Sequence, residues 1–272
     1  MKSRTYKKLK MHKIRRKDLT LSRQTMINML SHSPDPYMSV LYTIQIDNLK
    51  AFIHEQRQST GKRITLNHVM NKVIALCIDK HRVFNRVVLD NNLYELEEIH
   101  VTNTFMLPGT GNVLTVFIVE NPHEKTLSQI VDDFDAVKKQ KREEHAQKPR
   151  DYLNLLSRIY GRTALYKLIS EKRAFKIVYH RGINSNIGIS NVGYGGKADY
   201  IIVKPAIFFL RTILRLSVHG SQITPVVENG KLVARETIPL TVSADHRVLD
   251  GYHLHLLGAE LHRITSAPEK YL

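Results

Sequence analysis

The residues with the clearest capacity for chemistry lie near the C-terminus, where Asp250 and Gly251 follow four and five positions after His246. The local pattern predicts a strand, a sharp turn and a helix, a junction that often holds side chains at a cleft. An imidazole that titrates near neutrality suits removal of a proton from a thiol, whose pKa is about 8.5. Asp250 can orient the turn by accepting hydrogen bonds. Taken alone, this six-residue pattern also occurs by chance, and an isolated histidine in it is more often structural.

The other reactive side chains indicate no competing site. Cys77 is the sole cysteine, which excludes an internal disulfide framework, and its apolar helical surroundings predict a buried, unreactive thiol. A reducing compartment, the cytoplasm, fits this usage. His253, His255 and His262 lack metal-binding spacing and an acidic or cysteine partner, so we expect no metal site. The sequence also shows neither a phosphate loop nor a dinucleotide fingerprint.

The elements that must position His246 form a mixed α/β pattern with much antiparallel pairing. Asp47 is the expected cap of the second helix and Gly61 its stop, and Thr126 with Gln129 predicts a capping box. Asn229-Gly230 predicts a two-residue β-hairpin. Helices are expected at 21–30, 47–60, 65–80, from 126 onward and at 252–265. Strands are expected at 38–46, 86–89, 99–106, 114–119, 187–190, 201–203, 224–228, 231–235 and 239–243.

The chain divides into a basic N-terminal arm at 1–20 and a single domain at 21–272. Its 272 residues suffice for one large α/β domain, and its 42% hydrophobic content is that of a globular protein. Residues 151–179 predict a pair of basic amphipathic helices, which either pack on their own domain or lie on a membrane surface. No run of 18 apolar residues or secretory leader is recognisable.

The formal charge of +16 is concentrated at the N-terminus. Residues 1–23 hold ten Lys and Arg against one Asp, a net +9. Such an arm can bind nucleic acid, an acidic membrane surface or an acidic partner, or lie across a neighbouring subunit. Nucleic-acid binding is disfavoured, because nothing resembles a zinc finger and aromatic residues are too few for a base-stacking platform. Basic surface would also favour capture of polyanionic coenzyme A (CoA).

Three segments closely resemble the dihydrolipoamide acyltransferases, the acyl-transferring components of the 2-oxoacid dehydrogenase complexes. They are TPVVENGKLV at 224–233, IPLTVSADHRVLDG at 238–251 and the glycine-rich IGISNVGYGG at 187–196. The related chloramphenicol acetyltransferases share the His-x-x-x-Asp-Gly element. The motifs stand in the family's order and at about its spacing, and the resemblance extends from about residue 20 to 272.

The resemblance implies a chloramphenicol-acetyltransferase-like domain that forms a trimer or larger homo-oligomer, with CoA as a substrate. In this arrangement His246 of one subunit is the general base and faces Ser190 of its neighbour. Ser190 would donate a hydrogen bond to the oxyanion, a contribution of about 3 kcal/mol for a preorganised donor. Asp250 would hold the geometry, and Asn191 and Gly193 would shape the loop. Which residues bind CoA is not indicated.

Departures from the family pattern leave alternatives open. No lipoyl domain is recognisable before the core, Ala244 stands where the family usually has tyrosine, and 151–179 has no counterpart in the standard core. The acyl carrier is therefore free acyl-CoA, a lipoyl or acyl-carrier protein on another chain, or a more lipid-like substrate. A non-catalytic scaffold that keeps the fold is the second interpretation, although it would not need His246, Asp250 and Ser190 together. A module that binds a membrane surface or an acidic partner is the third.

Overall fold

The structure is a computed structural model that describes residues 10–31, 33, 35–89, 91–106, 114–146, 185, 187–193, 201–203 and 212–272. The helices expected at 151–179 lie outside the described residues, as do residues 1–9 of the basic arm. Of the helices that are described, none has a stretch both long and apolar enough to span a bilayer.

A mixed sheet forms the centre of the described fold. Its strands are β2 (Tyr37–Gln45), β5 (His100–Met106), β6 (Leu114–Glu120), β7 (Ile187–Asn191), β8 (Leu214–Val218), β9 (Gln222–Glu228) and β10 (Lys231–Asp245). The order is β2-β10-β8-β7-β5-β6, and β9 pairs with β10. The β5–β7 and β7–β8 pairs are parallel and the others antiparallel, so the sheet is mixed as the sequence predicts. A smaller sheet has β4 (Asn92–Leu96) between β1 (Met11–Lys13) and β3 (Arg86–Leu89).

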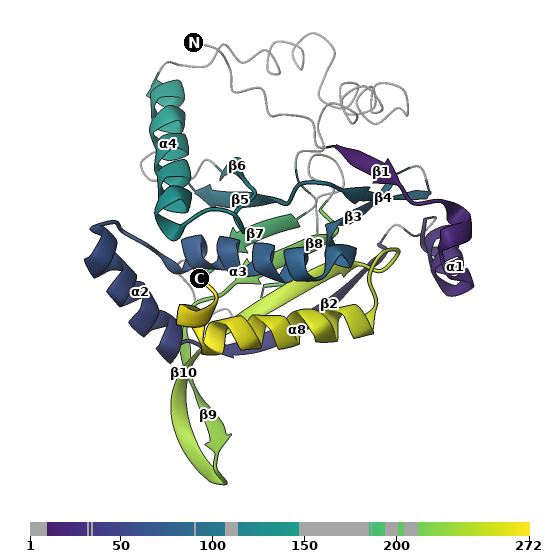
Figure 1. Cartoon of the computed structure of the whole chain (residues 1–272). Coiled ribbons are helices and arrows are strands. Elements are labelled where there is room, and N and C mark those ends of the chain that lie inside the picture. The colour runs from purple at the N-terminus through teal and green to yellow at the C-terminus, as the bar shows by residue number, and fades with distance from the viewer. Residues whose placement is uncertain are drawn as a thin grey trace.

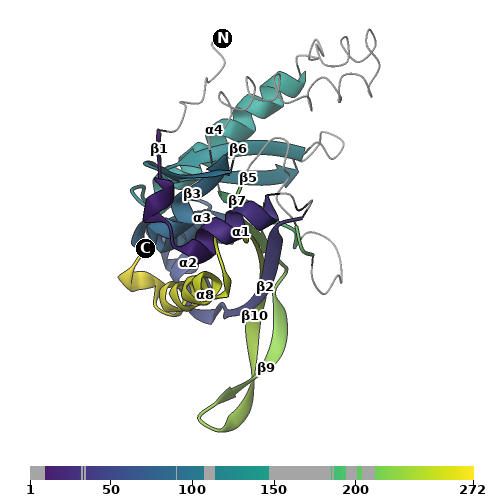
Figure 2. The same ribbon diagram turned by 90° about the vertical axis from the view of Figure 1, so that its right-hand side faces the viewer.

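Helices cover one face of the larger sheet. They are α2 (Asp47–Thr60), α3 (Leu66–Lys80) and α8 (Gly251–Ser266), and Figures 1 and 2 show them as one layer against the strands. Helix α4 (Leu127–Ala146) packs against β6 and α3, and α1 (Leu21–Leu30) lies beside the smaller sheet. Short 3-10 turns occupy Arg16–Asp18, Arg82–Asn85 and Pro268–Lys270.

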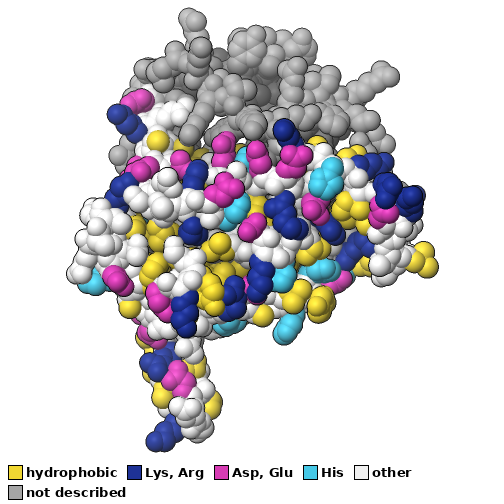
Figure 3. Space-filling view, viewed as in Figure 1, with side chains coloured by type: hydrophobic (Ala, Val, Ile, Leu, Met, Phe, Trp, Pro, Cys, Tyr) yellow, Lys and Arg dark blue, Asp and Glu magenta, His cyan; other side chains and the backbone are white. Residues whose placement is uncertain are grey.

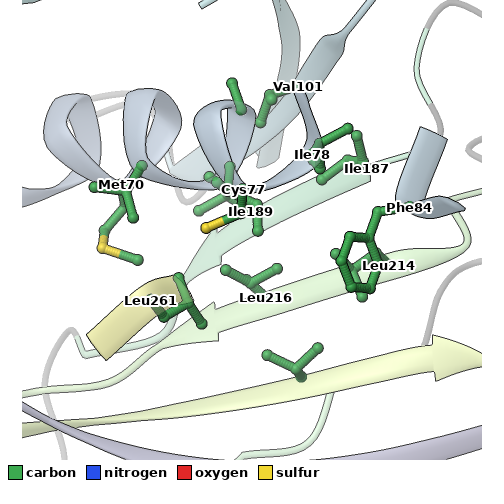
Figure 4. Close-up of a cluster of buried hydrophobic side chains, with 14 of the residues drawn as sticks. Met70, Cys77, Ile78, Phe84, Val101, Ile187, Ile189, Leu214, Leu216 and Leu261 are labelled. Carbon is green, nitrogen blue, oxygen red and sulfur yellow. The ribbon is translucent and has the colours of Figure 1, made fainter. Parts of the chain in front are cut away.

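The two faces of the central strands differ in character because successive side chains of a strand point to opposite faces. Ile187 and Ile189 of β7 point toward α3, where Cys77 lies in the same buried cluster (Figure 4). The residues between and beyond them, Gly188 and Ser190, therefore lie on the opposite face. That face carries buried or half-buried polar side chains from four neighbouring strands: Thr104, Ser190, Arg215, Ser217 and Thr241.

Several local predictions are confirmed. Gly61 ends α2 in the left-handed region, with φ of 67°. The capping box of α4 forms, because the backbone N–H of Thr126 donates to the Gln129 side chain and that of Gln129 to the Thr126 hydroxyl. Asn229 and Gly230 both have positive φ, 50° and 76°, which a two-residue hairpin of this kind requires. The β9–β10 hairpin projects away from the body of the protein (Figure 2).

Other predictions are wrong. Residues 201–203 form no strand, and the two strands expected at 231–235 and 239–243 are one continuous strand, β10. Asp47 is the first residue of α2 and Ile46 is its N-cap, without a side-chain capping bond. Strands β1, β4 and β8 were not expected. Strand β8 contains a buried arginine, which conceals its apolar pattern.

Candidate active site

His246 stands in the turn that joins β10 to α8, and hydrogen bonds fix this turn. The last residue of β10, Asp245, is 2% exposed and its carboxylate is paired with the Arg247 guanidinium at 2.6 Å. The Asp245 carbonyl accepts from the amides of Val248 and Leu249, whose side chains are buried in the core. Apolar anchors and a buried ion pair thus hold the backbone on both sides of the histidine.

The ring of His246 is held in one tautomer. Its Nδ1 lies 2.8 Å from the carbonyl oxygen of Leu249. A carbonyl oxygen only accepts, so Nδ1 must carry the proton and donate it, which leaves the lone pair on Nε2. The ring is half-buried, and its backbone N–H donates to the carbonyl of Pro36 at 2.8 Å. The arrangement leaves Nε2 able to accept a proton, and the bond that orients the ring is made to a backbone carbonyl.

Asp250 is the N-cap of α8 and lies at the other end of the same turn. Its Oδ1 accepts from the backbone N–H of His253, and its Oδ2 accepts from Arg23 at 2.9 Å. Burial alone would raise the pKa of Asp250, but the hydrogen bonds from His253 and the charge of Arg23 outweigh it and lower the pKa. The carboxylate therefore stays ionised, and its hydrogen bonds join the turn to α1 and α8.

Arg23 of α1 completes this group and was missed by sequence reasoning. Its Nη1 donates to the carbonyls of His246 (3.3 Å) and Arg247 (3.1 Å), while Nη2 is bonded to Asp250. One side chain thus ties three points of the turn to a helix more than 200 positions earlier in the chain. No local sequence signal could have revealed this role, because the partners of Arg23 lie more than 200 positions away and the residues around it form no motif with them.

Ser190 belongs to a second group, on β7. Its Oγ lies 2.7 Å from Oγ1 of Thr104 on β5 and 3.4 Å from Nη2 of Arg215 on β8. Nη2 of Arg215 also donates to Thr104 Oγ1 at 2.9 Å. Ser190 is half-buried, so its hydroxyl lies between a buried polar cluster and the surface.

The two groups lie far apart within one chain. Ser190 is paired across the sheet with Ser217, and Ser217 with Thr241 on the antiparallel β10. His246 follows Thr241 by five positions, in the direction opposite to the one in which β7 reaches Ser190. At about 3.3 Å a residue and 4.8 Å a strand, the two residues are separated by roughly 16 Å along the strands and 10 Å across them. Among the described residues, no hydrogen bond joins the two groups.

The loop after Ser190 borders a cavity. The Asn191 side chain donates to Asn67 of α3 and accepts from the backbone N–H of Gly193. A Cβ at Gly193 would lie 2.7 Å from the backbone nitrogen of Gly220, so glycine allows two backbone segments to approach closely here. An open cavity of about 280 Å³ lies alongside, with largely apolar walls. Its lining includes Ile46, Leu49, Ile53, Asn191, Gly193 and His219.

Cys77 lies away from both groups, in the core between α3 and the sheet (Figure 4). Burial, reinforced by the charge of Glu260, raises its pKa to about 12, so the thiol stays protonated and unreactive. Among the residues that the structure describes, no three His, Cys, Asp or Glu side chains are arranged to hold a metal ion.

Sequence comparison places this geometry in a known context. The family model for the 2-oxoacid dehydrogenases acyltransferase (catalytic domain) matches residues 11–153 and 162–272. The chain belongs to this family. It is an acyltransferase of the 2-oxoacid dehydrogenase type, as the sequence resemblance implies. No curated protein sequence matches it.

Solved structures share the fold of this acyltransferase. The cubic core of a pyruvate dehydrogenase multienzyme complex and the dihydrolipoamide acetyltransferase of Azotobacter vinelandii each have a TM-score of 0.65 at 18% identity, covering 91% of this chain and 88% of theirs. A chloramphenicol acetyltransferase has a TM-score of 0.56 at 11% identity, covering 94% and 100%. The expected chloramphenicol-acetyltransferase-like mixed-sheet fold is confirmed.

Proposed function

We propose that this acyltransferase moves an acyl group between CoA and a thiol such as dihydrolipoamide, at sites formed by His246 of one copy and Ser190 of its neighbour. The observation that carries the proposal is the hydrogen bond from Nδ1 of His246 to the Leu249 carbonyl. It reserves Nε2 for proton transfer and fixes the direction in which the ring presents it.

The chemistry balances with these groups alone. Nε2 of His246 takes the proton of the acceptor thiol, and the thiolate sulfur attacks the thioester carbonyl carbon. The C=O electron pair moves to oxygen, where the Ser190 hydroxyl donates a hydrogen bond to the oxyanion. When the carbonyl re-forms, the bond to the leaving sulfur breaks, and the imidazolium returns its proton to that thiolate.

The distance between the two groups supports a site shared by two copies. A base and an oxyanion donor must each reach a reacting centre only a few ångströms wide. Ser190 and His246 of one chain are separated by roughly 16 Å along the strands and 10 Å across them, as judged from strand register. We therefore propose that a neighbouring copy supplies the His246 that acts with Ser190.

The β9–β10 hairpin supports self-association. Ile223, Val227 and Leu232 share one face of it and are 69%, 71% and 75% exposed. An exposed apolar face on a projecting element is typical of a protein–protein contact. Figure 3 shows yellow apolar side chains among charged ones along this hairpin. We propose that it packs on another copy in a trimer or larger homo-oligomer.

A relative supports the residue roles. The study of the Azotobacter vinelandii enzyme concerns a serine, a histidine and an asparagine in its catalytic mechanism. There the asparagine stands four positions after the histidine, the spacing that separates Asp250 from His246 here. An amide and a carboxylate both accept hydrogen bonds, which is the role that Asp250 has at the turn.

The cavity beside Asn191 and Gly193 is the proposed channel for the thioester arm. Asn191, the residue that follows Ser190, is part of its lining, and its apolar walls suit a long, mostly uncharged chain such as the pantetheine arm of CoA. Lys50 also stands in its lining, where its ammonium is paired with the Glu236 carboxylate at 2.5 Å. Narrowing the cavity with Leu66→Trp should raise KM for acyl-CoA far more than it lowers kcat.

The proposal is tested by acyl exchange followed by mass spectrometry. The purified protein is given a panel of acyl-CoAs with dihydrolipoamide and other small thiols, alongside His246→Ala and Ser190→Ala. We expect transfer with the wild type, loss of at least about 100-fold with Ser190→Ala, and loss to background with His246→Ala. His255→Ala, which changes an exposed histidine of α8, is the matched control and should retain activity. Absence of transfer from a folded wild-type oligomer to any acceptor would contradict the proposal.

A further inference from the structure

Arg215 occupies an unusual place for a cation. It is the second residue of β8, with 6% of its surface exposed. Its neighbour on β7 is Gly188, where a Cβ would lie 2.8 Å from Nη1 and 3.0 Å from Cδ of the arginine. The glycine therefore makes the room that the guanidinium occupies, and the two positions form one unit.

The charge of Arg215 has no acidic counterpart in the described part of the chain. Burial lowers the pKa of the guanidinium, and Nε is buried without a hydrogen-bond partner among the described residues. A buried, uncompensated cation destabilises a fold, because the charge loses its hydration without gaining a partner. Stability alone therefore does not account for an arginine here, whereas a site that develops negative charge does.

The hydrogen bonds around Arg215 run in one direction. Arginine is a donor only, so Thr104 Oγ1 accepts from Nη2 at 2.9 Å. Thr104 has one proton to donate. Its Oγ1 lies 2.7 Å from Ser190 Oγ and 3.4 Å from the carbonyl oxygen of Ile189, and the shorter contact is the stronger bond. Ser190 Oγ also accepts from Arg215 at 3.4 Å. When Thr104 donates to Ser190, the lone pairs of Ser190 are occupied and its own proton is directed away from the cluster.

We propose that Arg215, acting directly and through Thr104, is a positioning residue that orients the Ser190 hydroxyl as a donor and strengthens that donor for the oxyanion of the transition state. This inference rests on the proposed function. A chain of hydrogen bonds that begins at a cation polarises each hydroxyl along it, so the last O–H is a stronger donor than an isolated serine. The benefit arises when negative charge forms on the carbonyl oxygen, and binding of the uncharged thioester gains little from it.

A competing role for Arg215 is recognition of a carboxylate on the acyl group. Its Nη2 is already bonded to two hydroxyls and Nε is buried, so the side chain presents little to a substrate. The two roles differ in outcome. Polarisation of Ser190 lowers kcat for every acyl group, whereas carboxylate recognition raises KM only for acyl groups that carry an acid.

The test measures kcat and KM for one neutral and one carboxylated acyl-CoA in Arg215→Met, Arg215→Lys and Thr104→Val. We expect Arg215→Met and Thr104→Val to lower kcat by about 10- to 100-fold with both substrates and to change KM by less than about threefold. Arg215→Lys keeps a donor cation and should recover part of the loss. The limb of the pH profile that belongs to the histidine base should not move in any of them.

Double variants decide whether the effect passes through Ser190. In a Ser190→Ala background, Arg215→Met should cost less than about twofold more, because the hydroxyl it acts on is already absent. Gly188→Ala pushes the guanidinium aside without touching Ser190, so it should lower kcat in the wild type and have no further effect in Arg215→Met. This second pair keeps the test informative should removal of the arginine impair folding.

The outcomes are distinguishable. Loss of kcat in Ser190→Ala but normal kcat in Arg215→Met, Thr104→Val and Gly188→Ala overturns this proposal and leaves the proposed function standing. A KM effect confined to the carboxylated substrate also overturns it. Full additivity of Arg215→Met and Ser190→Ala shows that the arginine acts elsewhere and refutes the relay. A folded wild-type protein that transfers no acyl group overturns the proposed function, and this proposal with it.

Discussion

Replacing Arg23 with methionine should loosen the histidine turn while leaving the rest of the fold intact. The change removes three hydrogen bonds at once, those to the carbonyls of His246 and Arg247 and the one to Asp250. Methionine keeps most of the apolar contact made by the arginine stem. The backbone that carries the His246 ring is then held less firmly, so kcat for acyl transfer should fall together with the free energy of unfolding.

The magnitude follows from the geometry. The side chain of Arg23 is 15% exposed and that of Asp250 is 40% exposed, so their ion pair is partly screened and worth at most about 1 kcal/mol. The two bonds to backbone carbonyls contribute about 1 kcal/mol each. Arg23→Met should therefore lower the free energy of unfolding by roughly 2 to 3 kcal/mol, and Asp250→Asn by about 1 kcal/mol, with a coupling between them of about 1 kcal/mol.

Urea denaturation of the two single variants and the double variant measures these values. Arg82→Met is a matched control, since Arg82 donates to the carbonyls of Leu96 and Glu97 far from the turn. It should lower stability by a similar amount and leave kcat unchanged. A loss below about 0.5 kcal/mol for Arg23→Met, or a coupling near zero with Asp250→Asn, would refute the assigned role of Arg23.

Four further predictions concern the framework around the site. Burial, with the nearby charge of Lys138 adding to it, lowers the pKa of His68 to about 4, so the unfolded chain binds more protons below pH 6.5 and stability falls as pH drops toward 4. His68→Gln keeps an acceptor for the backbone N–H of Thr65 but cannot be protonated. Between pH 7 and pH 5 the free energy of unfolding should therefore fall by about 2 kcal/mol less in this variant than in the wild type, as measured by urea titration. Cys77 should resist iodoacetamide at pH 8 until the protein is denatured, and rapid labelling of the native protein would contradict the pKa of about 12. Gly258→Ala should lower the melting temperature despite the better helix propensity of alanine, because its Cβ would meet the Tyr42 ring at 2.6 Å. Ile223→Glu on the hairpin should shift the protein to monomers in sedimentation and abolish transfer, while Lys231→Glu at the hairpin tip should not.

Elements with a strong local signal could be predicted from the sequence. The buried stripe of α4, the glycine stop of α2 and the Asn229-Gly230 hairpin each depend on a few neighbouring residues, so the chain specifies them locally. The turn that holds His246 was recognised for the same reason. A strand, a capping aspartate and the following helix lie within one short segment.

Features that depend on distant partners could not be predicted. Strand β8 contains Arg215 and Ser217 between its apolar residues, and the gap left by Gly188 on the adjacent strand allows the arginine to be buried. Residues 201–203 have a strand-like composition, but pairing decides whether a segment becomes a strand. Arg23 reaches its partners across most of the chain. In each case a contact between remote positions decided the outcome, and a single sequence does not show which remote residues are in contact.

The most direct test of the central claim is complementation between inactive variants. Chains carrying His246→Ala and chains carrying Ser190→Ala are co-expressed at equal levels with different tags, and the mixed oligomer is purified through both tags. If each site takes His246 from one copy and Ser190 from the next, every mixed trimer that carries both tags has one intact site of its three. Acyl transfer should therefore recover to about a third of wild type in trimers, and toward about a quarter in larger oligomers. Mixed oligomers as inactive as either parent, with full activity in a wild-type control carrying the same tags, would contradict the shared site.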